Sequence, residues 1–363
     1  MYLNSIQMKR LLFLLALLSF QLGVLAQQPL QVALAGLSHD HVHLVLNSYK
    51  KGEVKIIGIA EADQPLVTRM KERYQLPDNI FYKDVPSMLA QIRPDAVLAY
   101  NPISEHLAVV EACAPKGVPV MVEKPLATTV KQAERIAALA EQYHIPVLTN
   151  YETTWYNSNQ QLYDLVRNQQ HIGPIRRMIV HDGHEGPKEI GCSKDFLRWL
   201  TDPEKNGAGA LTDFGCYGAN LMTWLMDGKA PVAVRAVTRQ IKPDIYPRVD
   251  DDATIILEYP DATGIIEASW NWPFSIKDLE VFGKKGYLHA RNASQLQGRK
   301  RDSTYTVPLK PAQFRDHLSY LQAVLKGGLQ PGNDLSSLQN NLIVVRILEA
   351  ARRSAREGKR IVL

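Results

Sequence analysis

"VALAGLSHDHVH", residues 32–43, runs from a short apolar segment through Gly36 into a segment expected to be helical. A β-strand that turns into a helix through one glycine is where a parallel α/β domain binds pyrophosphate. The turn needs a residue without Cβ, and the helix N-terminus offers free N–H groups. The later glycines of such a loop are missing here, and His39, His41 and His43 follow instead. The stretch therefore leaves two interpretations open, a nucleotide loop and a metal site.

Around this stretch, short β-rich runs alternate with helical runs as far as about Asn150. This alternation is typical of a parallel sheet with crossover helices. The clearest helix is expected over Thr129–Tyr143, where apolar residues recur at helical spacing. The expected strands are Gln31–Ala35, Val54–Ala60, Ile80–Tyr82, Ala96–Tyr100, Val118–Val122 and Ile145–Thr149. The sequence thus predicts an N-terminal, Rossmann-type doubly wound domain.

Beyond Tyr151 the pattern changes to longer alternating strands with little helix between them. Such a run predicts an α+β domain with one large, mostly antiparallel sheet. Its expected strands are Ala233–Gln240, Ala253–Tyr259, Gly264–Trp270 and Leu279–Phe282. A final helix is expected over Leu335–Glu357, with an apolar stripe that packs back near the first domain. The predicted divisions are a leader at 1–26, domains at 27–150 and 151–334, and the C-terminal helix within 335–363.

The N-terminus has the pattern of a Sec-type signal peptide. Lys9 and Arg10 precede the apolar run Leu11–Ala26, which ends in small residues, and polar positions interrupt it below the length of a membrane span. No twin arginine is present and no cysteine stands at the cleavage site to take a lipid. We therefore expect a periplasmic or secreted protein without a stable membrane anchor.

Composition narrows the class further. The 363 residues, 45% of them hydrophobic and 22% charged, predict a globular protein large enough for two domains. The formal charge of +5 falls to +3 (5 − 2) without Lys9 and Arg10, too little to indicate nucleic-acid binding. The basic cluster Gly298–Arg301 is interpreted as a hairpin tip. Cysteines at 113, 192 and 216 lack metal-site spacing, and one disulfide among them stays open.

A second feature supports the nucleotide interpretation. Glu61 follows the second expected strand, 25 positions after Gly36 (61 − 36), near the place where an acidic residue binds the ribose hydroxyls. The sequence around Glu61 and Asp63 holds no arginine to neutralise a 2′-phosphate, which favours NAD over NADP. Ser38 and His39 are expected to donate hydrogen bonds to phosphate or to cap the helix.

Several blocks carry a resemblance to a known family. These are "YNPISEH" (100–106), "VMVEKPLATT" (120–129), "NGAGALTDFGCYGANLMTWL" (206–225), "VDDDATIILEYPDATGIIEASW" (249–270), "LEVFGKKGYL" (279–288) and the ending from residue 336. Together they resemble the glucose-fructose oxidoreductase, inositol dehydrogenase and rhizopine-catabolism (Gfo/Idh/MocA) family over essentially the whole mature chain. The resemblance implies an NAD(P)-dependent oxidoreductase acting on carbohydrate CH–OH groups. It adds five residues to the cofactor site, namely Asn101, Pro102, His106, Glu123 and Lys124.

The resemblance also implies a catalytic centre at Lys124, Asp213 and Tyr217. Lys124 ends a parallel strand beside the ligand crevice, where it can bind a substrate hydroxyl. Asp213, Tyr217 and Asn220 lie at i, i+4 and i+7, which on one helix makes a polar stripe. Tyr217, with its pKa lowered by Lys124 from about 10, would take a proton from a sugar hydroxyl while hydride passes to the nicotinamide.

Other residues could contact the sugar. His181, His184 and Glu185 follow an expected strand, and His184 is assigned to the substrate site; a plain loop is the other interpretation. Trp155 could stack on a sugar face, although such aromatic residues also build cores.

A shared metal site on the three histidines is not predicted. On the helix expected after Gly36, no two of His39, His41 and His43 stand at i+3 or i+4.

The sequence predicts an NAD-dependent oxidoreductase of a sugar or glycoside, a homo-oligomer (dimer or tetramer) that pairs through an open face of the second sheet. Free NAD is scarce outside the cytoplasm, so an exported enzyme would need to retain its cofactor tightly. One alternative is a redox-neutral glycoside-cleaving enzyme, which oxidises a ring hydroxyl, eliminates the glycosidic group and returns the hydride. A second alternative is a non-catalytic sugar- or metal-binding protein.

Overall fold

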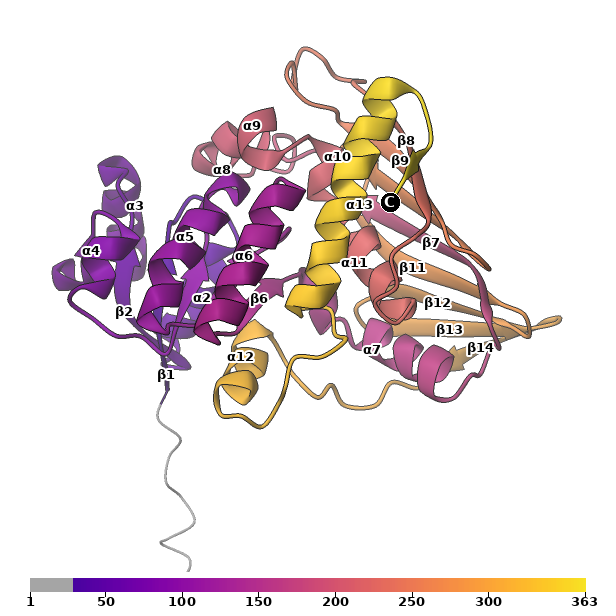
Figure 1. The fold of residues 1–363 in the computed structure, drawn as a ribbon, viewed down its shortest axis with the longest axis horizontal. Helices are drawn as coiled ribbons and strands as arrows, with labels where there is room; N and C mark the ends of the chain where they lie inside the picture. The colour runs from indigo at the N-terminus through magenta and orange to yellow at the C-terminus, as the bar shows by residue number, and fades with distance from the viewer. Residues whose placement is uncertain (1–28) are drawn as a thin grey trace, which may run out of the picture.

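The computed structural model describes residues 29–363, so the expected leader at 1–26 lies outside the described residues. The described chain forms two halves, each built on its own sheet (Figure 1). Within residues 29–363, no helix has both the length and the apolar character needed to cross a bilayer.

The first half is a six-stranded sheet of order β3-β2-β1-β4-β5-β6, and every neighbouring pair is parallel. Its strands are β1 (Leu30–Ala35), β2 (Val54–Ala60), β3 (Phe81–Tyr82), β4 (Ala96–Ala99), β5 (Val120–Glu123) and β6 (Val147–Asn150). Its helices are α2 (Val42–Lys50), α3 (Gln64–Tyr74), α4 (Val85–Leu89), α5 (His106–Cys113) and α6 (Val130–Tyr143). The prediction of a doubly wound parallel sheet is confirmed.

Local chemistry explains where these elements begin and turn. The Thr129 hydroxyl accepts a hydrogen bond from the Gln132 N–H and starts α6. Gly36 leaves β1 with a φ of +82°, and a Cβ there would lie 2.7 Å from the Cβ of Asn101. Only glycine fits this close approach between the ends of β1 and β4, where the strand order reverses.

The second half is a nine-stranded sheet of order β14-β13-β12-β11-β7-β10-β9-β8-β15, antiparallel except for the β7–β10 pair. Its strands are β7 (Ile175–Gly183), β8 (Ala233–Arg239), β9 (Asp252–Glu258), β10 (Thr263–Ser269), β11 (Ile276–Gly283), β12 (Tyr287–Asn292), β13 (Gln295–Lys300), β14 (Ser303–Val307) and β15 (Ile361–Val362). The mostly antiparallel sheet is confirmed, and the basic cluster Gly298–Arg301 lies at the β13–β14 hairpin.

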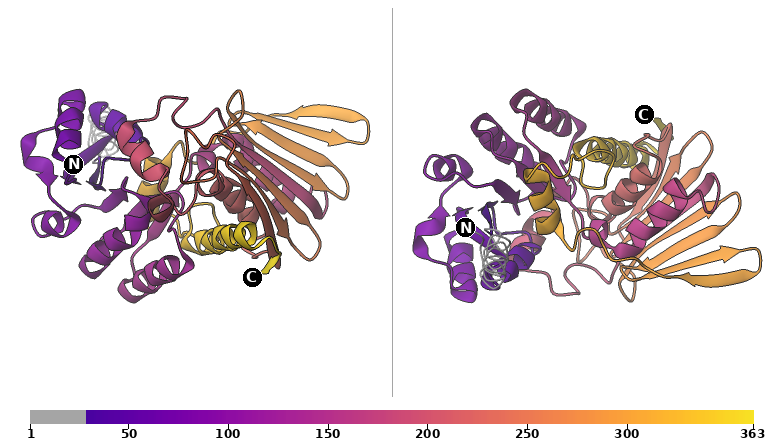
Figure 2. Two further views of the ribbon diagram at one scale, coloured as in Figure 1. Left: turned by 90° about the horizontal axis from the view of Figure 1, so that it is seen from above. Right: turned by 90° about the horizontal axis from the view of Figure 1, so that it is seen from below.

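Helices cover one face of this sheet, and Figure 2 shows the other face uncovered within the described chain. The helices of this half are α7 (Asn157–Tyr163), α8 (Lys194–Leu200), α9 (Pro203–Asn206), α10 (Ala210–Asp213), α11 (Gly215–Leu225) and α13 (Leu338–Glu357). Helix α13 lies between the halves (Figure 1). Val345 joins an apolar cluster of the first half, while Ile347 and Leu348 join the core of the second.

Two details differ from the expected organisation. Helix α12 (His317–Leu325), inside the segment 151–334, packs Leu318 and Leu321 into the core of the first half. The chain therefore returns to the first half before α13 begins. Cys113, Cys192 and Cys216 are all free thiols, so the disulfide left open by the sequence does not form.

Candidate active site

A cavity of about 610 Å³ opens at the point where the order of the parallel strands reverses. Ligands of doubly wound sheets bind at this place. Five predicted cofactor residues line the cavity, namely Gly36, Ser38, Glu61, Asn101 and Pro102. The lining also includes Lys83, Arg198 and Lys205. The structure thus brings together five of the nine residues that were predicted to bind the cofactor.

The Glu61 carboxylate is fixed at the edge of this cavity. One oxygen accepts the Leu37 N–H and the other accepts the Asp63 N–H, each at 2.9 Å. This is the position from which an acidic side chain binds ribose hydroxyls. The sequence showed no arginine near Asp63, but the fold brings one there. Arg198 of α8 donates a hydrogen bond to Asp63 Oδ2 over 3.2 Å. Sequence proximity could not reveal an arginine that arrives from the second half.

Helix α8 covers the loop that follows Gly36. The indole N–H of Trp199 donates to the Ser38 carbonyl (3.4 Å), and the Phe196 ring lies 4.7 Å from the His39 ring. Ser193 donates its backbone N–H to Asp40 over 2.9 Å. His39 is therefore buried under α8 and does not line the cavity. The second half contributes directly to the nucleotide loop.

Two of the predicted catalytic residues, Lys124 and Asp213, form an ion pair across the two halves. The Lys124 ammonium group donates to Asp213 Oδ1 (2.5 Å) and to the Asp213 carbonyl (3.0 Å), and the indole N–H of Trp270 holds the other carboxylate oxygen at 3.0 Å. Burial alone would lower the pKa of Lys124, but the Asp213 charge raises it. The pKa of Asp213 is lowered by Lys124 against the effect of burial. Both groups are ionised at neutral pH.

Tyr217 lies beside this pair, with the Lys124 ammonium 5.0 Å and the Lys277 ammonium 4.7 Å from the centre of its ring. The expectation that Lys124 lowers the pKa of Tyr217 is wrong. Burial raises this pKa well above its usual value, and nearby carboxylates, Glu152 first among them, raise it further. Because Asp213 neutralises the charge of Lys124, Lys124 does not stabilise a phenolate at Tyr217.

Three charged or titratable residues of this site were not predicted. Asp182, near the end of β7, pairs in register with Lys277 of β11, and Lys277 forms an ion pair with Glu152. Asp182 is fully buried, neither of its oxygens has a hydrogen-bond partner, and burial raises its pKa well above the usual range. The alternation of β7 was the available signal, because Asp182 shares the buried face of the strand with Met178 and Val180.

Asn220 does not belong to a polar stripe with Asp213 and Tyr217. The segment breaks at Phe214 into α10 and α11, and the Asn220 side chain donates to the Leu335 carbonyl (2.8 Å). His184 remains near the site, with its ring 4.8 Å from that of Phe214. Burial lowers the pKa of His184.

Other predicted residues lie elsewhere. Trp155 donates to Asn150 Oδ1 (3.0 Å) and lines a separate cavity of about 410 Å³ with Tyr320. His106 is buried against the Leu126 carbonyl (3.2 Å), and burial lowers its pKa to about 4. His181 bonds Asp278 (2.7 Å), a residue whose strand position places it on the face of the second sheet away from Asp182.

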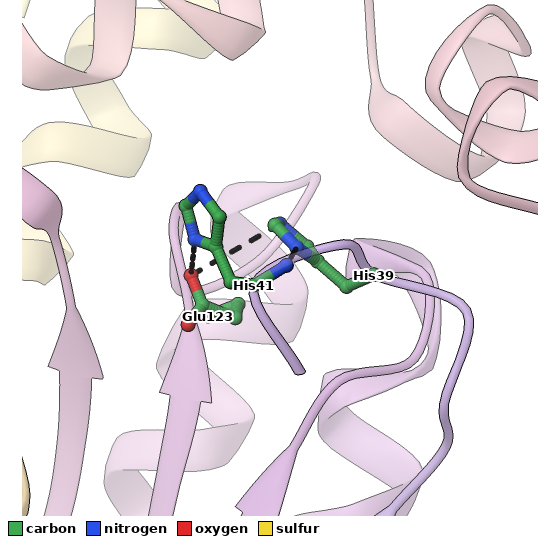
Figure 3. A group of neighbouring side chains, drawn as sticks. All are labelled: His39, His41 and Glu123. Atoms are coloured by element: carbon green, nitrogen blue, oxygen red, sulfur yellow. Dashed lines mark hydrogen bonds and ion pairs between the residues drawn. The ribbon is translucent and has the colours of Figure 1, made fainter. Parts of the chain in front are cut away.

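The three histidines of the opening stretch separate. Helix α2 begins at Val42, so His39 and His41 precede it, and the helical spacing argument does not apply to them. His41 Nδ1 lies 2.9 Å and His39 Nε2 lies 4.0 Å from Glu123 Oε2 at the end of β5 (Figure 3). Ligand atoms of these three residues lie within 4.8 Å of one another. His43 is on α2 and bonds the Tyr74 hydroxyl (2.8 Å).

Comparisons with known proteins agree with this architecture. Residues 30–151 match the model "Oxidoreductase family, NAD-binding Rossmann fold", and residues 159–289 match the "GFO/IDH/MocA C-terminal domain". D-xylose 1-dehydrogenase [NADP(+)] of Haloarcula marismortui is 26% identical over 59% of this chain and 58% of its own length. Rhizopine catabolism protein MocA of Rhizobium meliloti is 25% identical over 66% of this chain and 72% of its own.

Among solved structures, the aldose-aldose oxidoreductase of Caulobacter crescentus complexed with glycerol has the same fold. Its TM-score is 0.77 at 23% identity, covering 92% of this chain and 100% of that one. The two matched models, the nucleotide cavity and the order of the two sheets agree with one another. The chain belongs to the Gfo/Idh/MocA family of oxidoreductases.

Proposed function

We propose that this protein is an NAD-dependent oxidoreductase that transfers hydride between the nicotinamide ring and a hydroxyl group of a sugar or glycoside. The observation that carries the proposal is the buried Lys124–Asp213 pair, which lies at the carboxyl end of β5 and beside Tyr217. Lys124 has a hydrogen left to donate to a substrate hydroxyl. The sugar dehydrogenase among the relatives supports the substrate class.

The residues of the first half fit a dinucleotide. Gly36 allows the close approach at the loop, and Glu61 presents a fixed carboxylate at the cavity edge. A carboxylate at this position favours the free ribose hydroxyls of NAD over the 2′-phosphate of NADP. When bound, the nicotinamide accepts or returns a hydride. Gly36, Ser38, Glu61, Asn101 and Pro102 would hold the adenosine side of the cofactor.

The buried carboxyl group of Asp182 supports a second candidate function, the redox-neutral cleavage of a glycoside. Burial raises the pKa of Asp182, near Tyr217, well above its usual range, and a neutral carboxyl can donate a proton to a leaving glycosidic oxygen. Redox-neutral cleavage of a glycoside by oxidation, elimination and re-reduction needs such an acid. Asp182 would serve this role, while simple oxidation of a hydroxyl does not require it.

Two further expectations remain proposals. We propose that the chain is exported by the leader at 1–26 and retains its cofactor, with α8 closing over the nucleotide loop. The uncovered face of the second sheet would pair with another copy in a homo-oligomer.

The decisive experiment begins with native mass spectrometry of the purified mature protein, followed by titration with NAD and NADP. We expect retained or tightly bound NAD, and a keto-sugar with one NADH when sugars and glycosides are supplied. Aglycone release without net NADH would instead favour the redox-neutral function. Absence of binding of either nucleotide by well-folded protein would contradict both and favour a non-catalytic protein.

Lys124→Met and Tyr217→Phe complete this experiment. Lys124→Met, which loses the donor to the substrate hydroxyl, and Tyr217→Phe, which loses the hydroxyl group beside it, should each lower turnover. Tyr217→Phe should leave nucleotide binding unchanged. Sugar binding that survives without turnover in the native protein would support the non-catalytic alternative.

A further inference from the structure

Oxidation of a hydroxyl releases a proton, and the predicted proton acceptor is poorly suited to take it. Burial and neighbouring carboxylates raise the pKa of Tyr217, and the Asp213 charge raises that of Lys124. Both side chains are therefore protonated at neutral pH. A neighbouring group that holds a free lone pair is better suited to accept the proton.

His41 and Glu123 form a carboxylate–histidine dyad next to Lys124. His41 Nδ1 lies 2.9 Å from Glu123 Oε2, and the Asn150 amide donates to Glu123 Oε1 over 2.8 Å. Burial would raise the pKa of Glu123, but the charge and hydrogen bond of His41 hold it well below the usual range. Glu123 is thus an ionised carboxylate whose two oxygens are both occupied.

This geometry fixes which ring nitrogen of His41 carries the hydrogen. An ionised carboxylate only accepts hydrogen bonds, so Nδ1 is the N–H donor, and Nε2 of the neutral ring keeps a free lone pair. Figure 3 shows the second ring nitrogen pointing away from Glu123. The side chain of His41 is 29% exposed, whereas that of Glu123 is 2% exposed. His41 is therefore the more accessible member of the dyad.

His39 supports this arrangement and argues against an ion shared by the three residues. Its Nδ1 accepts the backbone N–H of His41 (3.1 Å), so its Nε2 carries the hydrogen and has no hydrogen-bond partner. A metal ion needs a lone pair from each ligand nitrogen. At His39 Nε2 and His41 Nδ1, the two nitrogens near Glu123, both positions hold hydrogens. The cluster is a donor network around one carboxylate.

His41 lies near several charged and titratable side chains of the candidate active site. It lies close to Glu152, which pairs with Lys277 beside Tyr217, and to His317 of α12. His39 faces it from the loop and Glu123 from β5, followed directly by Lys124. These charged and titratable groups surround His41.

We propose that His41 is a catalytic base of this enzyme, with Glu123 as the residue that positions it. His41 Nε2 forms a bond to the hydroxyl proton as the substrate O–H bond breaks. The O–H electron pair would form the C=O bond, and the C–H pair would leave as hydride to a bound nicotinamide. The inference rests on the proposed function, because that function supplies the oxidant.

The first test needs no turnover. Long-range ¹H–¹⁵N spectra of the full mature protein report the tautomer of each histidine. We expect neutral His41 with its hydrogen on Nδ1, and loss of this fixed tautomer in Glu123→Gln. His41→Gln identifies the signal. His43→Gln is the matched control, because His43 lies on α2 and contacts Tyr74 of α3 instead of Glu123. A hydrogen on Nε2 of His41 would overturn the proposal.

The second test compares binding with catalysis in the same variants. Glutamine at position 41 can still donate to Glu123 but cannot accept a proton at neutral pH. We expect His41→Gln to lower kcat by roughly 10²–10⁴-fold and to remove the acid limb of the pH profile. NAD affinity should stay within about threefold, and Glu123→Gln should give a smaller loss with a shifted limb. His43→Gln should match the native enzyme in all these measurements.

The outcomes separate this inference from the proposed function. Native protein that binds no nucleotide overturns both. NAD-dependent turnover that His41→Gln leaves unchanged, with an unchanged pH profile, overturns the base alone. A stoichiometric zinc ion in native mass spectra, lost in both His41→Gln and Glu123→Gln, would show a metal site and also overturn the base.

Discussion

Lys124 and Asp213, 89 residues apart in the chain, form an ion pair of 2.5 Å in which each side chain is less than one-tenth exposed. Lys124→Met should lower the free energy of unfolding by about 3–5 kcal/mol, because it leaves a buried carboxylate unpaired. Adding Asp213→Asn should recover most of this loss. Urea unfolding of the single and double variants measures both values, and equal stability of the two variants would contradict the argument.

The turn after β1 predicts a difference between two glycines. Gly36→Ala should destabilise the protein by more than about 1 kcal/mol, because a Cβ at this positive φ would also collide with Asn101. The variant should also lose NAD binding. Gly52 also has a positive φ (+73°), but a Cβ there meets nothing within 4 Å. Gly52→Ala should therefore cost only about 1 kcal/mol and leave binding intact. Thermal unfolding and nucleotide titration compare the two variants, and equal effects would contradict the collision.

Cofactor choice should depend on Glu61 and Arg198. Glu61→Ser removes the carboxylate that repels a 2′-phosphate, while Arg198 and Lys83 remain in the cavity lining. We expect NAD to bind at least about tenfold more weakly, in line with the loss of hydrogen bonds to a charged group, and NADP to bind more tightly. The gain for NADP should disappear in Glu61→Ser/Arg198→Ala. Titration calorimetry with both nucleotides tests this, and unchanged NAD binding in Glu61→Ser would reject the assigned role.

A pH effect is expected from Asp278, which bonds His181 (2.7 Å) and His289 (2.9 Å). Although burial opposes it, these bonds lower the pKa of Asp278 to about 2. The hydrogen bond that His181 donates to Asp278 raises the pKa of His181. The Asp278 contribution is present above pH 3.8 and lost as pH falls towards 2. The His181 contribution is present below pH 6.5 and lost as pH rises above it.

Asp278→Asn should therefore be least stable relative to the native protein between about pH 4 and 6.5, by roughly 1 kcal/mol. The difference should shrink at pH 8. Urea unfolding at pH 5 and pH 8 measures it, and Glu267→Gln, which removes the more distant partner of His181 (3.9 Å), is the control. A difference that grows towards pH 8 would contradict the assignment.

The alternation of strands and helices in the first half could be predicted because its signals are local. Apolar strands, the Thr129 cap of α6 and the glycine of the first turn each act within a few residues of sequence. Strands β12–β14 lacked such a signal. Polar and charged residues such as Arg291, Gln297 and Arg299 interrupt them, and their faces are only partly buried.

Residues of the candidate site could be predicted only where a single sequence motif contained them. Glu61 and Lys124 follow strand ends, a position that sequence reveals. Arg198, Lys277 and Glu152 come from distant segments, and only tertiary folding brings them to Asp63 and Tyr217. The same holds for His41 and Glu123, 82 residues apart, whose contact no spacing rule would suggest. The pKa of Tyr217 was predicted with the wrong sign because burial outweighs a cation already matched by Asp213.

Helix α13 has a consequence for how the molecule melts. Its Val345 packs with the first half and its Leu348 with the second, while the Glu349 carboxylate accepts the Val130 N–H at the start of α6 (2.8 Å). Neither half can lose its core without freeing a helix that the other half needs. The two cores should therefore denature together in one calorimetric transition, as a single cooperative unit.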